Sequence, residues 1–139
     1  MAKYGKYLIK EPHTVELAHH DVLEVKGCTW PPVTYLNKDI LPGSKASISV
    51  RWIWAVPEPN DHVTRHAHSS DEVILFLGTD ANNPTDLGAE LEITLGDEKI
   101  KVDKTSALYV PKGIEHNPEI WKRVDRPILQ VAVVLGEYD

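Results

Sequence analysis

The chain has a single cysteine, a single methionine and a single phenylalanine among its 139 residues. The lone cysteine, Cys28, forms no internal disulfide and supplies no multi-cysteine zinc or iron–sulfur site. Basic residues are also scarce, with 15 Lys and Arg against 21 Asp and Glu. This balance argues against a surface for nucleic acid or an anionic membrane. No apolar run approaches the length of a bilayer-spanning helix, so we expect no membrane segment.

The N-terminal stretch lacks the apolar segment of a signal peptide, which predicts a soluble, cytoplasmic protein. A hydrophobic share of 42% and a charged share of 26% are ordinary for a globular chain. We expect one domain over residues 1–139, because this length is typical of a single domain. A chain of this length buries a hydrophobic core without needing disulfides or structural metals. Histidine, with seven copies, is unusually frequent for so short a chain.

The apolar residues follow a period of two rather than 3.6, and prolines and glycines divide the chain into short segments. The clearest alternation lies in Ser47–Val56, which we predict as a strand. Its alternating apolar positions are Ile48, Val50, Trp52, Trp54 and Val56. Since these side chains share one face of a strand, we expect that face to be buried and Arg51 to be a surface charge.

Further strands are predicted where short apolar runs end at turn-forming residues. These runs are Val73–Leu77, Leu91–Leu95, Lys99–Val102, Ala107–Val110 and Ile128–Leu135. Gly96 and Asp97 are placed to form a hairpin turn, and Thr14 is placed to cap a short N-terminal helix over His13–Val25. About eight to ten short strands at close spacing indicate an all-β fold, a closed barrel or jelly roll with a ligand-sized mouth.

The first concentration of chemically active side chains lies between His66 and Glu72. On a strand, residues two apart point the same way, so His66 and His68 are expected to face into the barrel. Glu72 opens the next apolar strand with the parity of Ile74 and Phe76. We therefore expect its carboxylate on the same inner face.

The second concentration is Pro111-Lys112-Gly113-Ile114-Glu115-His116. Here a proline ends one strand, a glycine turns the chain, and His116 opens another strand. Three neutral imidazoles and one carboxylate on adjacent strands are a usual ligand set for a divalent transition metal. Two histidines and a carboxylate alone suit Fe(II) with positions open for substrate. The alternative is a set of polar residues hydrogen-bonded at a barrel rim.

Both segments resemble the two motifs of the cupin superfamily. The first motif has a glycine, five residues, His-x-His, three or four residues, Glu and a closing glycine. Its positions fall here on Asn60, His66, His68, Glu72 and Gly78. The second motif has a glycine, five residues, Pro-x-Gly-x-x-His, three residues and Asn. Its positions fall here on Thr105, Pro111, Gly113, His116 and Ile120. The departures at Asn60, Thr105 and Ile120 leave all four metal-binding positions of the family filled.

The resemblance implies a cupin-type double-stranded β-helix, a jelly-roll barrel, with its core at about residues 44–136. It implies that one divalent metal, of which Fe, Mn, Ni and Zn all suit the ligand set, is bound by His66, His68, Glu72 and His116. The implied activity is that of a dioxygenase, isomerase or lyase on a small oxygen-bearing substrate, such as a carboxylate, a keto compound or a sugar. The alternative is a non-catalytic sensor or small-ligand-binding domain. Cupins are often homodimers, so a homodimer is expected as well.

Six residues are candidates for the wall of a substrate pocket, namely Trp52, Trp54, His62, Phe76, Tyr109 and Gln130. Core packing is the favoured interpretation of the two tryptophans, and an aromatic pocket wall is the alternative. His62 is interpreted as a loop or rim residue. Gln130 is the most informative of the six, since a buried amide needs partners and is able to orient a substrate or a metal-bound water. No second acid or base is evident near the motifs, so we expect chemistry led by the metal.

Overall fold

A computed structural model describes residues 3–14 and 24–136. Within these ranges it contains ten β-strands and one 3-10 turn, η1 (Gly5–Tyr7), so the predicted all-β class is confirmed. The predicted N-terminal helix falls mainly on residues 15–23, which lie outside the described residues, and its first two positions form strand β1 (His13–Thr14). None of the helical structure in the described ranges is long and apolar enough to cross a membrane.

The strands from residue 47 onward lie close to the predicted segments, and two shorter strands that were not predicted precede them. Together they are β2 (Lys26–Cys28), β3 (Val33–Leu36), β4 (Ser47–Glu58), β5 (Glu72–Leu77), β6 (Asp86–Leu95), β7 (Glu98–Lys104), β8 (Ser106–Val110), β9 (His116–Val124) and β10 (Ile128–Val134). The predicted hairpin turn joins β6 to β7, and its Gly96 has a φ of 61°. Glycine adopts this left-handed conformation without steric cost, which explains the residue at this tight turn.

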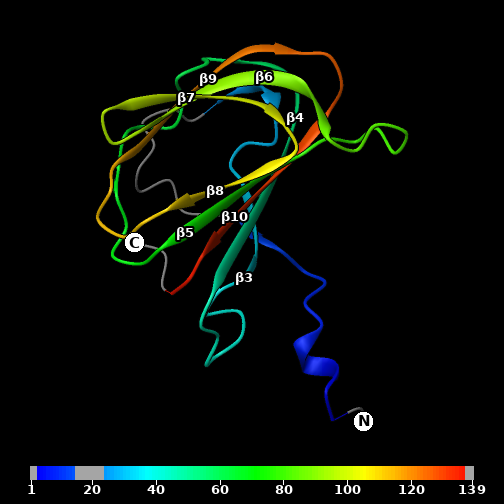
Figure 1. Cartoon of the computed structure of the whole chain (residues 1–139). Helices are drawn as coiled ribbons and strands as arrows, with labels where there is room; N and C mark the ends of the chain where they lie inside the picture. Colours follow the sequence, from blue (N-terminus) through cyan, green and yellow to red (C-terminus); the bar gives the residue numbers. More distant parts are fainter. Residues whose placement is uncertain (1–2, 15–23, 137–139) are drawn as a thin grey trace.

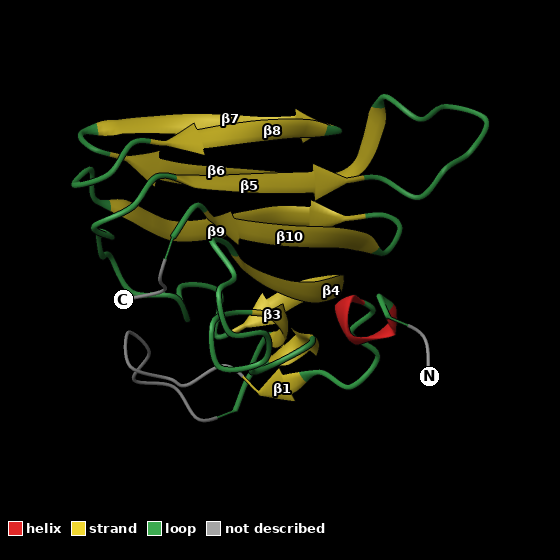
Figure 2. Cartoon of the chain, turned by 90° about the horizontal axis from the view of Figure 1, so that it is seen from below, coloured by secondary structure: helices red, strands yellow, loops and turns green. Residues whose placement is uncertain are grey.

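The strands form two antiparallel sheets. The larger sheet has the order β1-β3-β4-β10-β5-β8, with β2 also paired to β4, and the smaller has the order β7-β6-β9. Figure 1 shows β7, β6 and β9 arching over β8, β5 and β10. Figure 2, seen from below, shows the two sets of strands aligned one over the other. Each sheet therefore has an inner face that meets the other sheet.

The inner faces bury an apolar core contributed by both sheets. Leu91 and Ile93 of β6 and Trp121 of β9 are almost fully buried, as is Phe76 of β5. Burying an aliphatic or aromatic side chain of this kind stabilises the fold by about 1.5–3 kcal/mol. Phe76, a predicted pocket residue, is thus a member of the core.

The buried face of β4 is the opposite of the predicted one. Arg51 and Ile53 are 5% and 0% exposed, whereas Trp52 and Trp54 are 45% and 53% exposed. The alternation identified the strand, but a shift of one residue exchanges the two faces of a strand. The inner face accepts a charged side chain because polar partners from other strands surround it, as described below. The prediction that the tryptophans pack in the core is therefore wrong, and so is the placement of Arg51 on the surface.

Candidate metal centre

Backbone pairing brings two of the predicted histidines together. The His66 N–H donates to the His116 carbonyl at 3.1 Å, and the His116 N–H donates to the His66 carbonyl at 2.9 Å. The two residues form an isolated antiparallel bridge. His66 and His68 lie in the loop between β4 and β5 rather than on the predicted strand, while His116 begins β9 as predicted.

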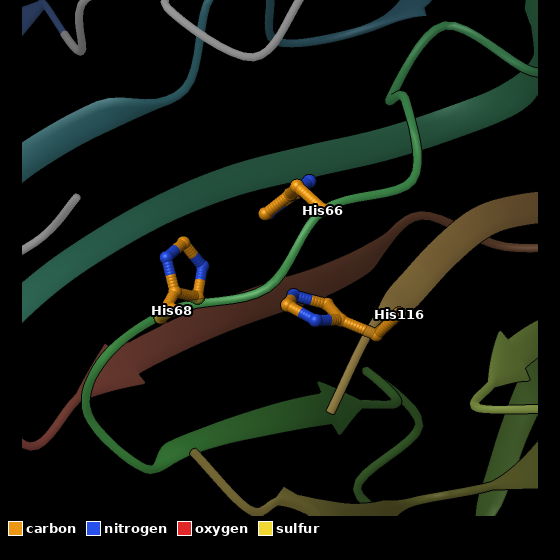
Figure 3. A group of neighbouring side chains, drawn as sticks. All are labelled: His66, His68 and His116. Atoms are coloured by element: carbon orange, nitrogen blue, oxygen red, sulfur yellow. The ribbon is translucent and has the colours of Figure 1, made fainter. Parts of the chain in front are cut away.

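The side chains of His66, His68 and His116 gather in one place (Figure 3). Their ligand nitrogens all lie within 4.8 Å of one another. Nδ1 of His66 is 2.7 Å from the carbonyl oxygen of Thr64. A hydrogen bond donated by Nδ1–H to this carbonyl leaves the lone pair on Nε2, and such a bond orients an imidazole for metal binding.

Glu72, the first residue of β5, adds a carboxylate to the three histidines. Its Oε1 lies 2.9 Å from Nε2 of His116 and 3.6 Å from Nε2 of His68. The Glu72 side chain is buried. The four residues predicted from the two motifs therefore form a single group, which we call the histidine cluster.

The donors of the histidine cluster fit a metal ion. Oε1 of Glu72 is buried and faces two imidazole nitrogens, and Nδ1 of His116 is, among the described residues, a buried atom without a hydrogen-bond partner. Buried polar atoms are normally paired, so such atoms call for an explanation. Imidazole nitrogens and a carboxylate oxygen that converge in a buried place are the donors that a divalent transition metal prefers.

Hydrogen bonds hold the loop of His68 against the turn before β9. The Gly113 N–H donates to the His68 carbonyl at 2.9 Å, and the Lys112 N–H donates to Oδ1 of Asp71 at 2.8 Å. The Tyr109 hydroxyl donates to Oδ2 of Asp71, and this bond lowers the pKa of Asp71 and raises that of Tyr109. Tyr109, a predicted pocket residue, is exposed and braces this loop from outside.

A cavity of about 80 Å³ adjoins the histidine cluster. His66, Glu72 and His116 contribute to its lining. A buried water occupies roughly 10–15 Å³ on this measure, so the cavity has room for about six water-sized positions. The cavity is partly open to the surface, and a small molecule inside it would lie against the cluster.

Arg51 is the centre of a buried polar group that also lines the cavity. Its Nε donates to Oε1 of Gln130 at 2.7 Å, and its Nη2 donates to Oε2 of Glu119 at 2.8 Å. Its Nη1 is 2.6 Å from Nε2 of His62, and Nδ1 of His62 is 2.9 Å from the Pro59 carbonyl oxygen. The Gln130 amide also donates to Glu119. We call Arg51, His62, Glu119 and Gln130 the arginine network.

Sequence reasoning missed two members of the arginine network, Arg51 and Glu119. Arg51 alternates with tryptophans, which directed the prediction to the wrong face. The sequence did carry one correct signal, because Gln130 is a buried amide with partners, as predicted. His62 is 1% exposed and lies in the interior rather than at a rim.

The structure separates the six predicted pocket residues. Gln130 lines the cavity, and His62 contacts the lining through Arg51. Trp52 and Trp54 lie on the exposed outer face of β4, and Tyr109 is exposed as well. None of these three aromatic residues, all of them described, is part of the cavity lining.

Two departures from the motif pattern have local roles. The Asn60 amide donates to the Trp121 carbonyl and accepts from the Trp121 N–H, both at 2.8 Å, and so attaches its loop to β9. Oγ1 of Thr105 accepts a hydrogen bond from the Gly78 N–H at 3.0 Å. Polar side chains at these positions therefore anchor the loops and strand ends of the barrel.

Solved structures with a similar arrangement of strands include proteins named as cupins. A cupin-2 domain from Rhodospirillum rubrum matches 93% of this chain and 70% of its own, with a TM-score of 0.53 and 12% identity. A predicted oxalate decarboxylase from Thermotoga maritima matches 94% of this chain and 96% of its own, with a TM-score of 0.56 and 13% identity. An RmlC-like cupin from Shewanella frigidimarina matches 93% of this chain and 87% of its own, with a TM-score of 0.52 and 8% identity.

No family model and no curated protein matches the chain in sequence. At identities this low, the structural likeness establishes the fold. The chain therefore has the cupin fold, and the resemblance indicated by the two motifs is confirmed at that level.

Proposed function

We propose that the chain is a metal-dependent cupin, built as one domain over residues 1–139 with its barrel core at about 44–136. It binds one divalent transition metal, Fe, Mn, Ni or Zn, through His66, His68, Glu72 and His116. Its substrate is a small oxygen-bearing molecule, on which it acts as a dioxygenase, isomerase or lyase. The observation that supports this most strongly is the position of Glu72 Oε1, 2.9 Å and 3.6 Å from two imidazole nitrogens.

A bound divalent ion supplies Lewis-acid polarisation of a substrate oxygen or a site for O₂ chemistry. The residues of the chain position the substrate. Because His66, Glu72 and His116 share the cavity lining, a molecule in the cavity reaches the cluster directly. The arginine network fixes a guanidinium and a carboxylate in the same lining.

The proposal is tested by loading separate samples of the protein with Fe²⁺, Mn²⁺, Ni²⁺ and Zn²⁺. Each sample is incubated with a panel of small hydroxy acids, keto acids and sugars, and products are detected by mass spectrometry and oxygen uptake. We expect a product with at least one metal, and we expect Glu72→Ala to abolish it. Glu115→Ala is the matched control, because Glu115 is exposed and pairs with Arg65 outside the cluster.

Two outcomes would count against an enzyme. Product formation by Glu72→Ala at the wild-type rate would place the chemistry elsewhere. Ligand binding without product at any metal loading would identify the non-catalytic, ligand-binding alternative.

A homodimer is also part of the proposal. Exposed apolar side chains on the outer face of β4, among them Trp52 and Trp54, are suited to contact a second copy. Sedimentation equilibrium tests this against the chain mass of 15.6 kDa. A mass of one chain at micromolar concentration would contradict it. The cytoplasmic location stays a prediction from the sequence.

A further inference from the structure

The cavity is shared by two chemically different groups, the histidine cluster and the arginine network. Arg51, Glu119 and Gln130 are 5%, 3% and 7% exposed, and all three line the cavity. They come from three strands, β4, β9 and β10. Because the hydrogen bonds between them connect these strands, their side chains are fixed before any ligand arrives.

Stability alone is a poor explanation for the ion pair of Arg51 and Glu119. Taking two charges out of water costs several kcal/mol for each ion. A protein with apolar residues of similar volume in place of a buried ion pair is often equally stable. The pair does not lie within the apolar core but on the lining of a cavity. This position favours a role in recognising what the cavity holds.

The charges around the cavity indicate the charge of its ligand. Arg51 and Glu119 cancel each other, and Glu72 is the other carboxylate in the lining. A divalent ion in the histidine cluster would therefore leave one net positive charge. A monoanion neutralises this charge in a region of low dielectric, whereas a neutral molecule leaves it uncompensated.

We propose that the cavity binds the monoanion of a small hydroxy or keto carboxylic acid with about six non-hydrogen atoms. The oxygen atoms of the acid are shared between the histidine cluster and the lining formed by Arg51, Glu119 and Gln130. The Arg51–Glu119 pair offers N–H donors beside a carboxylate acceptor, so it recognises a hydroxyl or carbonyl group and discriminates against an apolar one. This inference rests on the proposed function and names its substrate class.

The test compares four probes on Mn²⁺-loaded protein by calorimetric titration. Lactate and pyruvate have the expected charge and size, propane-1,2-diol has a similar size without charge, and gluconate has the charge on a longer, six-carbon chain. We expect lactate or pyruvate to bind at least about tenfold more tightly than both controls. Metal content is measured on every sample by elemental analysis.

The variant for this test is Arg51→Met/Glu119→Leu, which removes both charges and so leaves no unpaired buried charge. Its matched control is Arg65→Met/Glu115→Leu, which removes an exposed pair of the same type with a separation of 2.6 Å. We expect both proteins to retain the metal and only the first to bind lactate or pyruvate at least about tenfold more weakly. Ala132→Leu is a second variant. Ala132 lines the cavity, so the larger side chain reduces the space inside it and leaves the residues of the arginine network in place.

The outcomes separate the two proposals. If the metal is bound but no probe binds, or if Arg51→Met/Glu119→Leu and Ala132→Leu bind the probes as the wild type does, the substrate class is wrong and the metal site stands. If the double variant does not fold, probe binding by Ala132→Leu decides. A wild-type protein that takes up no metal overturns the proposed function, and the substrate class with it.

Discussion

Arg51 and Glu119 form an ion pair with a separation of 2.8 Å inside the barrel, although 68 residues separate them in the sequence. Arg51 belongs to β4 in the larger sheet, and Glu119 belongs to β9 in the smaller sheet. The pair is therefore a polar link between the two sheets as well as part of the cavity lining. Its removal should change both stability and ligand binding.

Removing one partner of this link should be strongly destabilising. Arg51→Met leaves the Glu119 carboxylate buried without its counter-ion, and we expect a loss of about 3–5 kcal/mol in the free energy of unfolding. Arg51→Met/Glu119→Leu should recover part of that loss, because it removes both charges but leaves the buried Gln130 amide without these two partners. Urea unfolding measures both, and Arg65→Met, at the exposed pair, should cost at most about 1 kcal/mol. An Arg51→Met protein as stable as the wild type would disprove the buried pair.

Neighbouring residues of β4 should respond differently to truncation because they lie on opposite faces. Ile53→Ala removes a fully buried side chain, and we expect a loss of about 2–5 kcal/mol. Trp54→Ala removes a side chain that is 53% exposed, and we expect a change within about 0.5 kcal/mol in the monomer. Thermal or urea unfolding measures both variants. If Trp54→Ala lost more stability than Ile53→Ala, the buried face of β4 would be the one predicted from the sequence.

The ion pair of Asp86 and Arg126 should make stability depend on acid pH. Nη2 of Arg126 donates to Oδ2 of Asp86 at 2.5 Å, and this bond, followed by the Gly88 N–H, lowers the pKa of Asp86 below its ordinary 3.8. A carboxyl group with a lowered folded-state pKa stabilises the protein above its unfolded pKa, and this contribution is lost as the pH falls through the folded value.

Asp86→Asn should therefore be less stable than the wild type at neutral pH, and the difference should decline below the ordinary Asp pKa and vanish below the lowered folded-state pKa. Urea midpoints across a pH series measure this. In an Arg126→Met background, Asp86→Asn should show a smaller pH-dependent difference. A constant difference between wild type and Asp86→Asn at every pH would contradict the assignment.

The charge of Glu72 should be needed for metal affinity. Glu72→Gln keeps the size of the side chain and removes the negative charge, and we expect affinity for Zn²⁺ or Mn²⁺ to fall at least about 100-fold. Mutation of a residue that only orients a metal ligand already lowers metal affinity about 10–100-fold. Competition with a chelator measures the affinity, and Glu115→Gln should leave it unchanged. Equal affinity in Glu72→Gln and wild type would remove Glu72 from the ligand set.

Two members of the histidine cluster were predictable from local pattern, whereas His66 and His68 lie in a loop rather than on the predicted strand, and only the motif indicated their role. Glu72 opens an apolar strand, and His116 follows a proline–glycine turn, so local geometry sets the direction of both side chains. The sequence does not state that His66 pairs with His116, yet the two motifs imply that their ligands meet. That pairing is what the backbone hydrogen bonds produce.

The arginine network was not predictable from local pattern. Two of the partners of Arg51 lie 68 and 79 positions away, on β9 and β10. Whether a strand residue faces inward depends on the register with neighbouring strands. A prediction from hydrophobicity alone placed Trp52 and Trp54 on the inward face. In this barrel a satisfied polar cluster occupies the inner face, and two tryptophans lie on the outer face.

The metal content of the protein tests the central claim most directly. Elemental analysis is carried out on wild type purified without added metal, on the same protein after loading and dialysis, and on His66→Ala/His116→Ala. We expect close to one equivalent of a divalent transition metal in loaded wild type and almost none in the folded double variant. A wild-type protein that holds less than about a tenth of an equivalent after loading would contradict the account.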